Sequence, residues 1–184
     1  MDYVTADLHL GHKSILGYQP RPFRDVEEHD AAIIGNINAA VKTNDRLWII
    51  GDFSFGNPAK YIERINCQDI RLFLGNHDFR WLTKFKKIER VRIYYFDDID
   101  FGVCTAALCH FPIRSWSRRR HGAIHLHGHV HGHIVDPVPG SMDVGVDTNS
   151  YKPWNIVDAA AFIAGRDGDW AERIRNGGDR YDKQ

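Results

Sequence analysis

Histidines are concentrated in one short stretch of this 184-residue chain. Residues 126–133 read LHGHVHGH, so four of the eleven histidines fall within eight positions, and glycines separate two of the pairs. Neutral imidazole is the commonest metal ligand in proteins. The glycine before His129 also removes side-chain crowding, which lets His129 and His131 point into one space. The stretch therefore indicates a metal site.

Further groups of metal-ligating residue types occur elsewhere in the sequence. They are Asp7-Leu8-His9, Gly51-Asp52, Gly75-Asn76-His77-Asp78 and His110. Each follows a short apolar run where a strand would end, and functional groups of open α/β sheets collect outside the carboxyl ends of strands. Asp7 and His9 are two positions apart, so an extended backbone would point both side chains the same way. We therefore expect five separate segments to converge on one rim.

The expected ligand set is too large for one tetrahedral ion. It consists of Asp7, His9, Asp52, Asn76, His110, His129 and His131. Seven such groups suit two divalent cations that share an aspartate oxygen, and such pairs lie ~3.5–4 Å apart in enzymes of phosphoryl transfer. Mixed nitrogen and oxygen ligation favours Mn, Fe or Zn over Mg or Ca. Among these metals we favour Mn.

Alternating strands and helices are predicted around these segments, which gives an α/β protein. Short apolar runs predict strands at residues 3–6, 47–50, 70–74, 91–96, 103–109, 123–126 and 142–146, with Asp97, Asp98 and Gly102 as turn residues. Helical spacing predicts a helix over residues 24–42, and prolines predict helix starts for residues 58–65 and 153–164. We expect one domain over residues 1–184, with a polar tail from about residue 165.

Composition narrows the class of protein. A hydrophobic content of 43% and a charged content of 26% are typical of a globular protein. The 24 basic residues balance the 24 acidic ones, so there is no strong signal for nucleic-acid binding. Cys67, Cys104 and Cys109 lack the CxxC spacing and fit a reducing compartment. Without a signal peptide or a long apolar span, we expect a cytoplasmic protein with no membrane partner. The oligomeric state is open.

The five groups, taken in order across residues 7–131, resemble the motifs of the calcineurin-like metallophosphoesterase family. The matching residues are Asp7-x-His9, Gly51-Asp52, Gly75-Asn76-His77-Asp78, His110 and Gly128-His129-x-His131. Arg21-Pro22-Phe23 and residues 142–147 (MDVGVD) further resemble a compact prokaryotic and phage branch of this family. The resemblance implies a four-layer α/β/β/α sandwich of two mixed sheets, with the helices outside.

The resemblance also implies a role for each residue. The implied ligands of the first metal are Asp7, His9, Asp52 and His131, and those of the second are Asp52, Asn76, His110 and His129. Asp52 would bridge the two ions, and a hydroxide between the ions would attack phosphorus in line. His77 would stabilise or protonate the leaving oxygen, and Asp78 would orient His77. His127 and His133 are expected outside the ligand set.

Substrate contacts are expected from His12, Arg114 and Arg118. His12 and Arg114 could instead be a solvated loop residue and a surface arginine. The basic run at residues 117–121 either draws anionic substrates toward the rim or is a solvated loop. Few residues remain between the motifs to build a cap for a large partner. We therefore expect a small phosphate ester, with phosphodiesters such as cyclic nucleotides favoured over phosphomonoesters.

Every motif also has a purely structural interpretation. Asp7 and His9 could form a turn and a cap, and Asp52 could cap the next element. Residues 76–78 could be a polar turn, and residues 126–133 a lone structural metal site. The whole chain could be a non-catalytic metal-binding scaffold. A scaffold would be expected to lose ligands or the residue equivalent to His77, and here none is missing.

Overall fold

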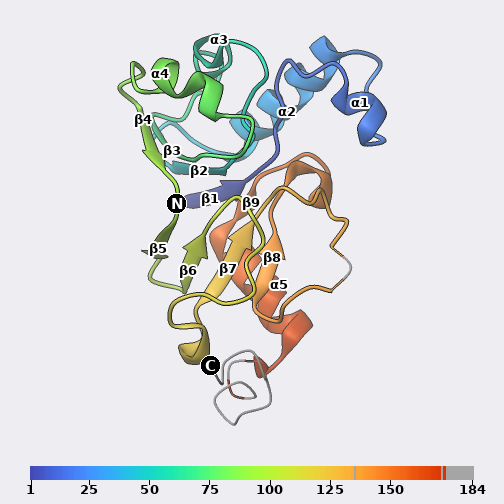
Figure 1. Ribbon diagram of the computed structural model, residues 1–184. Coiled ribbons are helices and arrows are strands. Elements are labelled where there is room, and N and C mark those ends of the chain that lie inside the picture. Colours follow the sequence, from blue (N-terminus) through green and yellow to red (C-terminus); the bar gives the residue numbers. More distant parts are fainter. Residues whose placement is uncertain (135, 171, 173–184) are drawn as a thin grey trace.

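Two mixed β-sheets form the centre of the computed structural model, which describes residues 1–134, 136–170 and 172 (Figure 1). The first sheet has the order β4-β3-β2-β1-β9, with β1 (Asp2–Thr5), β2 (Arg46–Ile50), β3 (Asp69–Phe73), β4 (Val91–Tyr94) and β9 (Trp154–Asn155). The second has the order β5-β6-β7-β8, with β5 (Asp97–Asp100), β6 (Thr105–Leu108), β7 (Ile124–His127) and β8 (Ser141–Asp143). The edge strands β9 and β5 are antiparallel to their neighbours, and the other pairs are parallel.

Helices pack against both sheets. They are α1 (Ile15–Tyr18), α2 (Val26–Ala40), α3 (Pro58–Ile62), α4 (Leu82–Phe85) and α5 (Ile156–Asp167), with 3₁₀ turns η1 (Phe79–Trp81), η2 (Arg119–His121) and η3 (Val146–Thr148). Helices α2, α3 and α4 contribute to the core under the first sheet, and α5 contacts β1, β8 and β9. The predicted four-layer arrangement of two mixed sheets is therefore confirmed.

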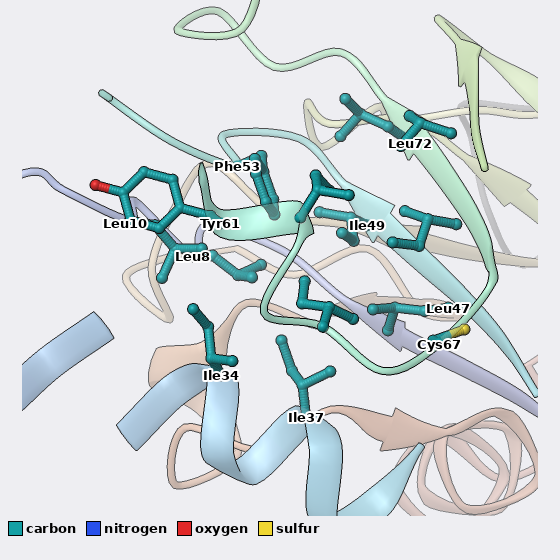
Figure 2. Packing of buried hydrophobic residues seen from close by; sticks show 14 of the residues in the cluster. Leu8, Leu10, Ile34, Ile37, Leu47, Ile49, Phe53, Tyr61, Cys67 and Leu72 are labelled. Atoms are coloured by element: carbon teal, nitrogen blue, oxygen red, sulfur yellow. The ribbon is translucent and has the colours of Figure 1, made fainter. Parts of the chain in front are cut away.

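One core lies between the first sheet and its helices (Figure 2). Leu47 and Ile49 of β2 meet Ile34 and Ile37 of α2 there. Complete burial of such a side chain contributes about 1.5–3 kcal/mol relative to leaving it exposed. Because side chains alternate along a strand, Ile50 faces the other way, into a second core that includes residues of β6 and β7. Both faces of β2 are thus buried, as its continuous apolar run predicts.

The N-terminus of α2 is fixed by two reciprocal hydrogen bonds. The Asp25 carboxylate accepts from the Glu28 backbone N–H (2.8 Å), and the Glu28 carboxylate accepts from the Arg24 N–H (2.7 Å). This capping arrangement satisfies N–H groups that have no partner within the helix. It sets the start of α2, whose first turn carries the buried pair His29 and Asp30 toward the loop after β1.

The two sheets meet at the carboxyl ends of their strands. Ala6 and Gly145 form a parallel bridge, and the Val146 N–H donates to the Ala6 carbonyl (3.0 Å). Beyond β1, the chain continues beside the chain that follows β2, because the Asp7 N–H donates to the Gly51 carbonyl (3.0 Å). The loops that carry the predicted metal ligands therefore leave both sheets at one shared edge.

Some predicted elements differ from the structure. Asp97 and Asp98, predicted as turn residues, begin the strand β5, because a polar sequence is tolerated in an edge strand. The helix predicted from residue 153 begins at Ile156, because residues 154–155 pair with β1, and it extends to Asp167. Of the predicted tail, residues 171 and 173–184 lie outside the described residues. Among those described, no helix has the length and apolar character needed to cross a membrane.

Candidate metal centre

The structure brings all seven predicted ligands to one place. Ligand atoms of Asp7, His9 and His131 lie within 4.8 Å of one another, and so do those of Asp7, Asp52 and His110. Asn76 Oδ1 lies 3.1 Å from His110 Nε2, and the ring of His129 is 5.2 Å from that of His110. We call these seven residues the candidate metal centre. It contains groups that follow strands of both sheets.

Five of these residues have a left-handed backbone conformation, which side chains other than glycine rarely adopt. The φ angles are 56° for Asp7, 49° for His9, 54° for Asp52, 72° for His129 and 49° for His131. Each such residue costs roughly 1–3 kcal/mol, and conformations of this kind cluster at active sites and ligand clamps. Their concentration here indicates that the backbone is arranged to aim these side chains, at a cost in stability.

Glycines allow the loops to approach closely. Gly51 has φ = 87°, and a Cβ at this position would clash with the imidazole of His110. A Cβ on Gly128 would lie 2.5 Å from Asp7 Oδ2 and 2.6 Å from the Cβ of Ala6. These are separations that real Cβ atoms do not show. Gly51 and Gly128 are therefore needed at these positions, because segments that are distant in the sequence lie too close there for any side chain.

A buried nitrogen without a partner tests whether these residues fit a metal ion. Among the described residues, Nε2 of His9 has no hydrogen-bond partner, although the side chain is only 3% exposed. It lies 4.0 Å from Asp7 Oδ1 and 3.7 Å from Asp52 Oδ2. Atoms that bind one cation at about 2.1 Å stand about 3–4 Å apart, so this spacing fits a shared ion. The donor set therefore fits a divalent metal.

His110 is oriented in a way that supports the same conclusion. Its Nδ1 donates to the carbonyl of Ile50 (2.9 Å), which leaves the Nε2 lone pair facing Asn76 Oδ1 (3.1 Å) and Asp52 Oδ2 (3.5 Å). A hydrogen bond from one ring nitrogen commonly fixes the tautomer of a metal-binding histidine. Three facing acceptors repel one another, and a cation between them removes that repulsion.

The electrostatics of the centre also favour a cation. Burial raises the pKa of Asp7 well above its usual range, and the nearby carboxylates of Asp143 and Asp52 raise it further. Burial likewise lowers the pKa of His9. Buried carboxylates close together are unfavourable unless positive charge balances them. A divalent cation bound to Asp7 and Asp52 would supply that charge.

His77 lies at the rim beside Asp52. Its Nε2 is 3.8 Å from Asp52 Oδ2, its backbone N–H donates to Asp52 Oδ1 (3.0 Å), and its side chain is 39% exposed. The ring is therefore open to solvent on one side and close to the candidate metal centre on the other. This placement suits a residue that exchanges a proton with a bound substrate.

Asp78 has a different role from the predicted one. Its Oδ2 accepts from the N–H groups of Asp52 (2.7 Å) and Gly75 (2.9 Å), and its Oδ1 accepts from that of Phe53 (3.0 Å). Burial raises the pKa of Asp78 to about 7, despite these hydrogen bonds. Within the described residues, no hydrogen bond joins Asp78 to the ring of His77. Asp78 thus joins the loops after β2 and β3 and does not orient that ring.

Two residues behind the centre were not predicted as site residues. His131 Nδ1 donates to Asp147 Oδ2 (2.7 Å), and the buried Arg21 forms a bidentate ion pair with the same carboxylate (2.7 and 2.9 Å). Burial raises the pKa of Asp147, but the hydrogen bonds from His131 and Arg21 outweigh it and hold that pKa below its usual value. The only signal in the sequence was that both residues fall in the segments resembling the compact branch of the family.

An aromatic and cationic group borders the other side of the centre. The ring of His12 stacks on Phe55, with centroids 3.5 Å apart and planes 8° apart, and the Arg80 guanidinium carbon lies 4.3 Å from the Phe55 centroid. Since His12 covers one face of Phe55, Arg80 covers the other. Phe55 is also 4.6 Å from His77, centroid to centroid. His12 is therefore at the rim, which is compatible with its predicted contact with substrate, and Arg80 is an exposed cation that the prediction missed.

The predicted contacts of Arg114 and Arg118 with substrate are not supported. Arg118 accepts a backbone hydrogen bond from Ala123 (3.2 Å), so it lies at the amino end of β7, about 13 Å of strand away from the ligands that follow β7. Arg114 pairs with Asp136 (3.3 Å). The loop after His110 leads away from the rim, which proximity in sequence does not reveal.

The basic run at residues 117–121 lies at the surface, as the solvated-loop interpretation expects, with one exception. Arg119 is buried, with its guanidinium carbon 5.0 Å from the centroid of Trp116, and Trp116 donates to the Ala123 carbonyl (2.6 Å).

The two histidines expected outside the ligand set differ in exposure. His127 is buried and bonds the Gly128 carbonyl (3.0 Å), whereas His133 is exposed and bonds Gln19 (3.0 Å). Neither histidine belongs to the two ligand groups described above.

The chain belongs to the same family as the uncharacterized protein MJ1445 of Methanocaldococcus jannaschii. The two are 32% identical over 165 residues, which cover 84% of this chain and 86% of that protein. The gene 66 protein of Mycobacterium phage L5 is 29% identical over 165 residues, covering 72% of this chain and 78% of the phage protein. The gene 66 protein of Mycobacterium phage D29 is 27% identical over 177 residues, covering 79% and 87%. No protein-family model matches the chain.

One solved structure supports the fold. The protein of unknown function AQ665 from Aquifex aeolicus superposes with a TM-score of 0.70 at 22% identity, covering 88% of this chain and 98% of that one. A conserved uncharacterized protein from Streptococcus pneumoniae TIGR4, described as a predicted phosphoesterase, superposes with a TM-score of 0.43 at 15% identity, covering 78% and 70%. The first similarity establishes the arrangement of sheets and helices, and the second is too low to bear on function.

Proposed function

We propose that this protein is a metal-dependent phosphoesterase that holds two divalent cations and hydrolyses small phosphodiesters. The observation that carries the proposal is the buried Nε2 of His9, which has no hydrogen-bond partner among the described residues and lies within 4.0 Å of carboxylate oxygens of Asp7 and Asp52. The left-handed backbone of five candidate ligands adds support, because such a conformation needs a compensating function.

In this proposal, each residue of the candidate metal centre has one role. The first cation would be held by Asp7, His9, Asp52 and His131, and the second by Asp52, Asn76, His110 and His129. Asp52 Oδ2 is 3.7 Å from His9 Nε2 and 3.5 Å from His110 Nε2, which suits a shared ligand. When bound, the two ions lower the pKa of water to give a nucleophile at neutral pH and balance the charge of the phosphate.

The remaining steps fall to side chains at the rim. Attack in line with the leaving oxygen requires a proton donor on the far side of phosphorus, and His77 is the exposed imidazole next to Asp52. Arg80 and His12, on either face of Phe55, border the same opening. Asn76 is exposed as well, so the rim is open to solvent. An open rim with short loops suits small diesters, including cyclic nucleotides.

The test is a comparison of esters with the metal-reconstituted protein. Protein stripped with a chelator is reloaded with Mn²⁺, Zn²⁺ or Mg²⁺ and assayed with bis-nitrophenyl phosphate, nitrophenyl phosphate and cyclic nucleotides. We expect turnover only after metal is added, highest with Mn²⁺, and faster on the diester. A clear preference for the monoester would instead make the protein a phosphomonoesterase. Two bound metals without turnover of any ester would favour a non-catalytic scaffold and overturn the proposal.

A further inference from the structure

Arg21 is a buried guanidinium whose five N–H groups all have partners. Nε and Nη2 donate to the two oxygens of Asp147 (2.9 and 2.7 Å). Nη2 also donates to the Asp7 carbonyl (2.8 Å), and Nη1 donates to the Leu8 carbonyl (3.2 Å) and to Nε2 of His29 (2.7 Å). The Arg21 side chain is 0% exposed. A guanidinium has five donors, so none is left over for another task.

These contacts join the two segments that supply the first cation's ligands. The carbonyls of Asp7 and Leu8 belong to the left-handed turn that aims Asp7 and His9. Asp147 accepts from Nδ1 of His131 (2.7 Å), which leaves the Nε2 lone pair of His131 free for a metal. His131 and the segment Asp7–His9 are more than 120 positions apart in the sequence. Arg21 fixes the geometry of both, the segment directly and His131 through Asp147.

The same guanidinium is connected to helix α2. His29 Nε2 accepts from Arg21, so its Nδ1 carries the proton and donates to Asp30 (2.9 Å). Both oxygens of Asp30 accept from the Gly11 N–H (3.0 Å each), just after His9. The turn that carries Asp7 and His9 is therefore held from both ends, by Arg21 before His9 and by Asp30 after it. The buried pair His29 and Asp30 in an otherwise apolar helix face is explained by this network.

We infer that Arg21 is a positioning residue that assembles the first metal site and leaves the second largely independent. The inference rests on the proposed two-metal centre. Two ligands of the second set are held by other groups: His110 by the Ile50 carbonyl, and Asp52 by the His77 N–H. The His129 N–H donates to the Asp7 carboxylate, which, within the described part of the chain, is the one hydrogen bond between the first set and His129. Among the described residues, no contact joins Arg21 to Asn76, His110 or His129. Loss of Arg21 should therefore affect the two sites unequally.

Arg21→Lys is the variant that tests this inference. Lysine keeps the charge but has three donors and no planar fork, so it cannot serve Asp147, two carbonyls and His29 together. The matched control is Arg90→Lys, because Arg90 donates to the carbonyls of Ile62, Ile65 and Cys67, away from the centre. Should Arg21→Lys fail to fold, Asp147→Asn removes the negative charge and one of the two acceptor oxygens that His131 and Arg21 use, while the carbonyl contacts of Arg21 remain.

The measurement is a Mn²⁺ titration of chelator-treated protein by calorimetry, with the bound metal counted and its paramagnetic resonance spectrum recorded. We expect two ions in the wild type and in Arg90→Lys. In Arg21→Lys and Asp147→Asn, one ion should bind about 10–100-fold more weakly, and the spectrum should change from that of a coupled pair to that of a single ion. Two ions with unchanged affinity, or equal weakening of both sites, would overturn the inference. A wild type that binds no Mn²⁺ would instead refute the proposed function.

Discussion

The imidazole of His77 combines exposure with contact to the candidate metal centre. We predict that His77→Ala leaves two metals bound but lowers kcat by roughly 10²–10⁴-fold, the usual contribution of a proton-transfer residue. Metal counting and steady-state kinetics on the same preparation give the two results. His133→Ala is the matched control, because that imidazole is exposed and bonds Gln19. If His77→Ala empties a metal site, the residue is a ligand and its assignment as a proton donor is wrong.

Arg80 is the cation expected to meet the substrate. It is exposed, lies against one face of Phe55, and donates from Nε to the His77 carbonyl (3.3 Å), which directs it toward the rim. We predict that Arg80→Gln raises KM several-fold with a smaller effect on kcat. The increase should be larger at low salt, where charges are less screened.

Arg114→Gln provides the comparison for Arg80→Gln. Arg114 is exposed and pairs with Asp136, on the loop that leads away from the rim. Kinetics at about 20 mM and 200 mM salt should show a change in the salt dependence of KM for Arg80→Gln alone. Equal changes in both variants would mean that Arg80 contributes only to the overall field of the protein.

At the scale of the elements, one buried histidine makes the second sheet sensitive to acid. His125 in β7 is 0% exposed, donates from Nδ1 to the Ala107 carbonyl of β6 (2.9 Å), and accepts at Nε2 from the Ile113 N–H (3.2 Å). The second contact requires the neutral ring, because a protonated Nε2 cannot accept a hydrogen bond. Burial lowers the pKa of His125 from 6.5 to about 4.

The sign of the effect on stability follows from this lowered pKa. His125 takes up a proton below about pH 6.5 in the unfolded chain, but only below about pH 4 in the folded protein. Its neutral ring therefore contributes its full share to the free energy of unfolding above pH 6.5, and this share is lost as the pH falls to 4. The loss amounts to about 3 kcal/mol. We predict that urea unfolding at pH 7, 5.5 and 4.5 shows a shallower decline for His125→Gln than for the wild type. Parallel declines would assign the acid sensitivity to other groups.

Local patterns predicted most of the sheet, and the exceptions have physical reasons. The run at β2 is apolar on both faces, so burial alone identifies it, and β3 is marked by its buried Ile70, Leu72 and Phe73. The strand β5 was missed because its sequence, DDID, lies at a sheet edge where polar side chains reach water. The strand β9 has two residues and exists only through its pairing with β1, in which Val4 lies opposite Trp154 and Tyr3 opposite Asn155, far apart in the sequence.

The candidate metal centre was predictable to a similar degree. Its candidate ligands could be proposed because residue type and position after an apolar run are both local properties. Arg21 and Asp147 could not be assigned in this way, because they meet across 126 positions and their role depends on that contact. The left-handed conformations of Asp7, His9 and Asp52 were also hidden, since aspartate and histidine adopt them more often than most residues but still in a small minority of cases.

At the scale of the whole molecule, the two sheets are held together where the candidate metal centre lies. The bridge between Ala6 and Gly145 joins the sheets at their carboxyl ends, and Asp7 directly follows Ala6. The Asp7 carboxylate accepts from the His129 N–H (2.9 and 3.1 Å), which connects the loop after β1 to the loop after β7. Metal bound to Asp7, Asp52 and His110 would therefore cross-link the sheets as well as take part in chemistry.

This arrangement predicts that metal stabilises the folded protein as a whole. Binding of one ion at 100 times its Kd adds about 2.7 kcal/mol to the free energy of unfolding. For a chain of this length, that corresponds to a rise in Tm of about 5–10 °C. Thermal unfolding with Mn²⁺ and with a chelator measures the difference. Ca²⁺, which prefers oxygen ligands, should give a smaller rise than Mn²⁺.

Asp52→Asn separates this stabilisation from any general effect of ions. The variant removes one negative charge from the residue proposed to bind both cations, so the rise in Tm with Mn²⁺ should fall to a small fraction of the wild-type value. Without metal, the variant should be at least as stable as the wild type, because the like charge of Asp52 that raises the pKa of Asp7 is gone. An unchanged rise with Mn²⁺ would mean that the ions bind elsewhere, and the candidate metal centre would lose its main physical support.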